Sequence, residues 1–163
     1  MAIYDVGKLI AETRRLAADY KRATGKSLAV SSEIALHDAC ELLQFEPLDD
    51  ESIGGYDAIG QHAAWKDLKV QIKGRAIFDE AKSGQRIGQL KLDKDWDVVV
   101  LVLMNQDFET QEIYMAMREE VENELAELAK TDSKRQSRGA MTVARFKHLA
   151  KLVWTPMEGI IVE

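Results

Sequence analysis

The sequence has almost no cysteine and no long apolar run. Its one cysteine, Cys40, cannot form an intramolecular disulfide, so we expect a protein of a reducing compartment, which favours a cytoplasmic location. The first fifteen residues lack the apolar stretch and small-residue cleavage site of a secretion signal. No run of about 18 apolar residues could cross a bilayer. These absences exclude a disulfide-stapled scaffold and predict no membrane partner.

The chain also lacks a net excess of basic residues. Its formal charge is −6, which argues against a protein that coats nucleic acid without specificity. However, residues 130–151 hold seven basic residues against one acid, and they directly follow an acidic stretch at residues 109–127. This basic segment either contacts phosphates or forms a solvated surface that offsets the acidic stretch. The candidate nucleic-acid contacts within it are Arg135, Arg138, Arg145 and Lys147.

What is present suits a folded α/β protein. The 163 residues, 46% of them hydrophobic, predict a single domain over residues 1–163 with one buried core. Apolar spacing and turn residues predict the order of elements. We expect a helix over residues 3–24 that stops at Gly25, a helix over 31–44 capped by Ser31 or Ser32, a strand over 54–60, a strand over 68–73, an irregular loop over 74–94, a central strand over 97–104, a strand over 111–117, and helices over 118–129 and 142–152 joined by a polar linker.

The two strands over 54–60 and 68–73 form a predicted hairpin. Its second strand has its apolar residues on one face and its polar residues on the other. Strict alternation in the second strand puts Leu68, Val70 and Ile72 on one face. The opposite face then carries Lys69, Gln71 and Lys73. The apolar face is expected to pack on the core, and the polar face is the candidate site.

These polar residues fit the hydrolysis of a phosphodiester with a divalent ion. Asp57 would offer carboxylate oxygens to Mg²⁺ or Mn²⁺, which favour oxygen ligands. Gln71 could add its amide oxygen and Ile72 its backbone carbonyl. Lys73, on the same face, would reach the attacking water or the charge that develops on the phosphate. Glu33, on the preceding helix, would complete the acidic set.

The series Glu33, then Gly55-Tyr56-Asp57-Ala58, then Gln71-Ile72-Lys73-Gly74-Arg75 resembles the PD-(D/E)xK, or restriction-endonuclease-like, nuclease superfamily. More narrowly, it is similar to small bacterial domains with a GE, GYDA and QIKGR pattern. The resemblance covers roughly residues 31–75. It implies a mixed sheet flanked by helices, a metal-dependent nuclease acting on DNA or, as a second choice, RNA, and Arg75 as a further nucleic-acid contact. Double-strand cutting would usually require two sites, hence a possible homodimer.

Other interpretations remain open at this stage. Gln71 replaces the usual acid and removes one negative charge, so the alternative is a nuclease-fold protein that has lost catalysis and acts as a nucleic-acid-binding or protein-interaction module. Asp57 could simply begin a turn, and the polar strand face could be an ordinary solvated one. A third possibility is a regulator whose acidic helix over 118–129 docks a partner.

Overall fold

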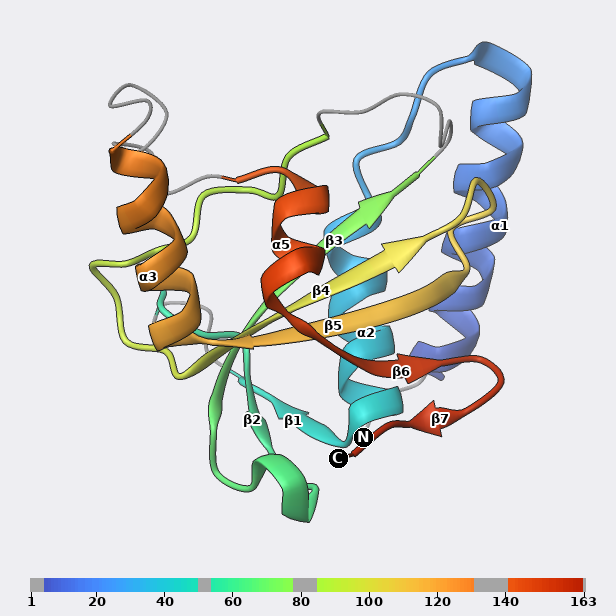
Figure 1. The fold of residues 1–163 in the computed structure, drawn as a ribbon. Coiled ribbons are helices and arrows are strands. Elements are labelled where there is room, and N and C mark those ends of the chain that lie inside the picture. Colours follow the sequence, from blue (N-terminus) through green and yellow to red (C-terminus); the bar gives the residue numbers. More distant parts are fainter. Residues whose placement is uncertain (1–4, 50–53, 78–84, 131–140, 163) are drawn as a thin grey trace.

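The computed structural model describes residues 5–49, 54–77, 85–130 and 141–162. Figure 1 shows their helices and strands arranged around one sheet. In chain order the elements are α1 (Val6–Thr24), α2 (Ser31–Leu43), β1 (Phe45–Pro47), β2 (Ala58–Gly60), the 3-10 helix η2 (Ala63–Trp65), β3 (Lys69–Ala76), β4 (Val98–Met104), β5 (Thr110–Met117), α3 (Arg118–Ala129), α5 (Val143–Leu149), β6 (Lys151–Thr155) and β7 (Gly159–Ile160). No helix in these ranges is long and apolar enough to span a membrane.

The strands of the described residues form one curled mixed sheet of seven, with neighbours following chain order from β1 to β7. Among the described strands only the β3–β4 pair is parallel, and Val70 stands beside Val98 at its start. The other pairs are antiparallel, including the predicted β2–β3 hairpin, in which Ala58 pairs with Val70. The predicted α/β class with a mixed sheet and flanking helices is therefore confirmed at this level.

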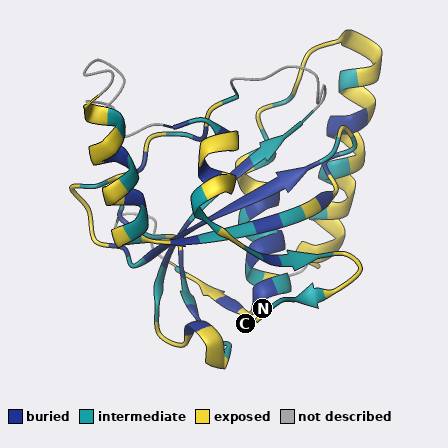
Figure 2. Cartoon of the chain, viewed as in Figure 1, coloured by how far each residue is buried: buried dark blue, intermediate teal, exposed yellow. Residues whose placement is uncertain are grey.

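Strand β4 is the centre of the molecule. All seven of its residues are buried, which the unbroken apolar run from Val98 to Met104 predicts for a strand covered on both faces. Figure 2 shows this continuous burial along β4, in contrast to the largely exposed surface of α1. The strand beside it, β3, carries the candidate chemical residues, so the site lies next to the most deeply buried strand of the sheet.

Two hydrophobic cores cover the two faces of the sheet. On one face, α1 and α2 pack through residues such as Ala17, Ile34 and Ala39 against Val70 and Val98; we call this the α1/α2 core. On the other face, α3, α5 and residues 85–96 pack against Val99 and Leu101; we call this the α3/α5 core. Because Gln71 and Lys73 stand in register beside Val99 and Leu101, they belong to the α3/α5 face.

The C-terminal elements differ from the prediction. The helix expected over 142–152 ends at Leu149, and Lys151–Thr155 forms β6 instead. Tyr114 pairs with Leu152 there, because the open edge of β5 offers backbone hydrogen bonds that local helical spacing cannot reveal. The short strands β1 and β7 were also not predicted. The linker expected after residue 130 lies outside the described residues.

Smaller differences concern element boundaries. The α2 N-cap is Val30 without a side-chain cap, so neither Ser31 nor Ser32 has the predicted role, although Gly25 does end α1 in a left-handed conformation with φ 74°. The strand expected over 54–60 is limited to β2, and β3 runs on to Ala76 into the expected loop. Within that loop, Ile87 and Leu90 are buried, so its described part is packed and not solvated.

Candidate functional site

Asp57 is fixed at the edge of β3, immediately before β2 begins. Its backbone N–H donates to the Val70 carbonyl at 2.8 Å, and its Oδ2 accepts the Ile72 N–H at 2.7 Å. Leu48 also donates its N–H to the Asp57 carbonyl at 3.1 Å. The N–H and carbonyl of one strand residue face the same edge, so the Ile72 carbonyl lies on the side where the Asp57 carboxylate is held. Asp57 is exposed, which leaves this edge accessible.

Gln71 is a buried polar side chain without a partner. It is only 3% exposed, and neither its Oε1 nor its Nε2 makes a hydrogen bond to any residue that the structure describes. A polar group buried without a partner costs roughly 1–3 kcal/mol, so native proteins rarely leave one unless water, an ion or a ligand satisfies it. This burial excludes, for Gln71, the interpretation of a solvated strand face.

Lys73 lies one pleat further along the same face and is half-buried. Burial lowers the pKa of its ammonium group, repulsion from Lys91 lowers it further, and attraction to Asp57 opposes both. Repulsion from Arg75 also lowers the pKa of Lys73, by a smaller amount. No ion pair of Lys73 occurs among the described residues. The strand therefore presents a partly desolvated cation close to the Asp57 carboxylate.

Close packing of α2 on β3 sets the depth of the site. A Cβ on Gly74 would lie 2.4 Å from the Ala35 Cβ and 3.1 Å from the Ser31 carbonyl oxygen, so only glycine permits this approach. Glu33 is on the same helix but is exposed, while its neighbours Ile34 and Ala35 face the core. The described residues contain no group of three or more histidine, cysteine or acidic side chains that could hold a metal ion.

The predicted nucleic-acid contacts have different surroundings. Arg145 pairs with Glu124 at 3.1 Å, and Lys147 lies 3.6 Å from Glu112, so acids engage both cations. Arg135 and Arg138 lie outside the described residues. Arg75, in contrast, is beside Lys73 on β3, and within the described part of the chain it donates only to backbone carbonyls, those of Arg86 at 2.7 Å and Gly74 at 2.6 Å.

Two residues near the site were missed by the sequence reasoning. Cys40 on α2 is close enough to Asp57 and Glu46 for their charges to reinforce burial, which together raise the pKa of its thiol to about 12. Lys91 repels Lys73 from within the segment expected to be an irregular loop. The signal for Lys91 was its place between Leu90 and Leu92, an alternation that indicates an ordered segment with one polar side.

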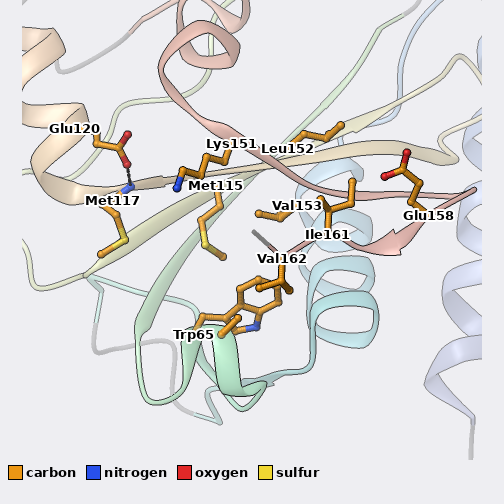
Figure 3. A pocket seen from close by; sticks show the side chains of 11 residues that line it. Trp65, Met115, Met117, Glu120, Lys151, Leu152, Val153, Glu158, Ile161 and Val162 are labelled. Carbon is orange, nitrogen blue, oxygen red and sulfur yellow. Dashed lines mark hydrogen bonds between the residues drawn. The ribbon is translucent and has the colours of Figure 1, made fainter.

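A separate cavity lies on the opposite side of the sheet. It has a volume of about 590 Å³, and Figure 3 shows Trp65, Met115, Val153 and Val162 converging on it, with Lys151 at its margin. Trp65 comes from the β2–β3 connection and Val162 from the end of the chain, so the curl of the sheet brings its two ends together here. None of the predicted site residues lines this cavity.

No protein-family model matches the chain, and no curated protein matches it.

Proposed function

We propose that this protein is a divalent-metal-dependent nuclease of the restriction-endonuclease-like type, with DNA as substrate and RNA as the second choice. The observation that carries the proposal is the pairing of two features on β3. The Asp57 carboxylate is held on the Ile72 N–H, and the adjacent Gln71 is buried with no partner for its amide. Neither feature is expected of an ordinary solvated strand, and both offer oxygen atoms that could bind a metal ion.

The donor set suits a hard cation. Asp57 keeps a second carboxylate oxygen, Oδ1, for which no bond occurs among the described residues, and Gln71 has an unpaired Oε1. With the Ile72 carbonyl, this makes an all-oxygen set of the kind that Mg²⁺ and Mn²⁺ prefer. When bound, such an ion supplies Lewis-acid activation of water and neutralises phosphate charge. With a single carboxylate in the set, we expect modest affinity.

The chain's own residues supply position and charge. The hydrogen bond from Ile72 holds the Asp57 carboxylate in one orientation before any ligand arrives, which limits the reorganisation needed on binding. Lys73 brings a half-buried positive charge to the same strand, where the lower local dielectric strengthens its attraction for a phosphate. The packed strand β4 behind β3 keeps both groups in place.

One observation favours a second candidate, a nucleic-acid-binding module without catalysis. The described residues hold no cluster of three acids or other metal-ligating side chains, and Gln71 stands where the family pattern has an acid. A module of this kind would keep Lys73 and Arg75 as phosphate contacts and would need no ion. A homodimer remains a prediction for cleavage of both strands of a duplex.

Calorimetry and cleavage separate the two candidates. We expect Mn²⁺ to bind the wild type and not Asp57→Ala, and plasmid or single-stranded DNA to be cut only by the wild type. Asp19→Ala is the matched control, because it removes an exposed carboxylate from α1 that pairs with the neighbouring Arg22. Equal Mn²⁺ binding by wild type and Asp57→Ala would refute the metal site. Nucleic-acid binding without cleavage of any substrate would favour the binding module.

A further inference from the structure

Residues 85–96, which we call the crossing segment, lie over the chemical face of β3 and are firmly anchored. Ile87 is buried and donates its N–H to the Met141 carbonyl at 3.1 Å. Trp96 is also buried, and its indole Nε1 donates to the Lys91 carbonyl at 2.8 Å. Arg118 at the start of α3 donates to the carbonyls of Leu92 and Lys94. These contacts hold the crossing segment in place opposite Lys73 and Arg75.

Two cations of β3 meet at one residue of the crossing segment, Gly88. A Cβ built on Gly88 would lie 3.5 Å from the Lys73 Nζ and 3.4 Å from the Arg75 Nη2. Gly88 does not have a positive φ, so the backbone does not require glycine there. A side chain there would instead reach van der Waals contact with the ends of two basic side chains, a contact that glycine avoids.

A third cation lies close to Lys73, and the Asp57 carboxylate only partly offsets the positive charge of the group. Lys91 donates to the Gly54 carbonyl at 3.2 Å and is close enough to repel Lys73. None of Lys73, Arg75 and Lys91 has an ion pair among the described residues, whereas Arg14, Lys69 and Arg118 all do. Like charges held together are unfavourable unless an anion joins them.

We propose that Lys73 and Arg75, which meet at Gly88, form with the nearby Lys91 a subsite for one phosphate group of the nucleic-acid backbone. This inference rests on the proposed function, and it extends that function by assigning the crossing segment to substrate binding. Arg75 is pre-oriented for this purpose, because its Nε and Nη1 are fixed on the Arg86 and Gly74 carbonyls and its Nη2 is left to donate. Gly88 adds no side chain between the Lys73 Nζ and the Arg75 Nη2.

Binding measured without metal tests the subsite independently of cleavage. The probe is a short fluorescent single-stranded oligonucleotide, followed by anisotropy in EDTA over a range of salt. We expect Arg75→Gln and Lys91→Gln each to weaken binding about tenfold, the loss typical of one charge-assisted hydrogen bond, and to reduce the salt slope by about 0.7. Gly88→Asp should weaken binding more, because it places a carboxylate between the cations.

Matched controls distinguish a site from net charge. Gln89→Asp adds the same charge to the next, exposed residue of the segment, and Lys66→Gln removes an exposed cation near the β2–β3 turn; both should bind almost as the wild type does. Inorganic phosphate should compete with the oligonucleotide, and acetate at equal ionic strength should not. Competition by both anions alike, or equal loss in Gly88→Asp and Gln89→Asp, would overturn the subsite.

The outcomes also separate the subsite from the nuclease proposal. Selective weakening in EDTA, together with no cleavage in Mn²⁺, would support the subsite and refute the nuclease. Cleavage in Mn²⁺ with unaltered binding by all three variants would refute the subsite and leave the nuclease. Circular dichroism melts check folding, and Lys91→Gln, which alters an exposed side chain, keeps the test valid if Arg75→Gln does not fold.

Discussion

Two buried polar side chains on opposite faces of the sheet have contrasting surroundings. On the α1/α2 face, Asp38 is 8% exposed and accepts hydrogen bonds from the Arg14 guanidinium at 3.1 and 2.9 Å and from the Thr110 hydroxyl at 2.6 Å. Arg14 also donates to the Phe108 carbonyl. On the α3/α5 face, Gln71 is buried more completely, and its side chain makes no hydrogen bond within the described ranges.

The contrast separates a structural polar group from a functional one. Asp38 connects α1, α2 and β5 through a set of partners that is complete, as expected where a buried charge is part of the architecture. Gln71 gains nothing comparable from the protein. Buried polar groups are normally hydrogen-bonded, and one that the fold leaves without a partner is typical of a site where a ligand supplies that partner. The following predictions test this contrast, beginning with the largest expected effect.

Asp38→Ala should lower the free energy of unfolding by about 3 to 5 kcal/mol, because the Arg14 guanidinium and the Thr110 hydroxyl lose their shared partner in a nearly buried position. Urea denaturation measures this change. Mn²⁺ binding by the folded fraction should be unaltered. Asp19→Ala, which breaks an exposed pair, is the control and should cost well under 1 kcal/mol. A loss for Asp38→Ala no larger than that of the control would contradict its structural role.

Lys73→Ala should reduce metal-dependent cleavage by about a hundred- to a thousand-fold, because it removes a charge directed at the phosphate. Its stability should change little, since Lys73 is half-buried, has no ion pair among the described residues and is repelled by Lys91. The assay compares initial cleavage rates in Mn²⁺, with thermal melts as the folding control. Cleavage that survives in the folded variant would remove Lys73 from the mechanism.

Gln71→Leu should stabilise the protein by about 1 kcal/mol, since an apolar side chain of similar size replaces an unsatisfied amide next to Val99. The same variant should bind Mn²⁺ more weakly than the wild type. Opposite changes in stability and in metal affinity, measured by urea titration and calorimetry, are the expected signature of a functional residue. A loss of stability in Gln71→Leu would instead mean that the amide is satisfied within the fold.

The sequence allowed the contrast to be anticipated only in part. The apolar run from Val98 to Met104 predicted β4, and the alternation around Val70 predicted β3 and its two faces, because both signals are local. Gln71 was placed on the correct face, but its burial depends on residues 85–96, which cross that face from a distance along the chain. No periodicity within β3 could report that cover.

Long-range contacts also explain the other differences. The convergence of Lys73, Arg75 and Lys91 requires the crossing segment to return over β3, which spacing along the chain does not specify. Strand β6 forms because β5 has an open edge, whereas the local sequence around Leu149 continues a helical pattern. The residue types of the site were therefore predictable, but their partners and burial were not.

Tyr114→Phe should have the smallest effect. It tests whether the behaviour expected of Gln71 comes from its face of the sheet or from its lack of a hydrogen-bond partner. Tyr114 packs against the same α3/α5 core as Gln71, but its hydroxyl donates to Glu112 at 3.0 Å. Losing this partly exposed bond should cost about 0.5 kcal/mol at neutral pH and leave Mn²⁺ binding unchanged.

Burial, then the hydrogen bond and charge of Glu112, raise the pKa of Tyr114 from 10.0 to about 12. Between these values the unfolded phenol has lost its proton while the folded one keeps it, so this contribution to stability declines as pH rises. The variant should therefore show a flatter decline than the wild type in urea titrations across this window. A difference between the two proteins that stays constant from neutral pH to pH 12 would mean that Tyr114 does not titrate as its contacts require.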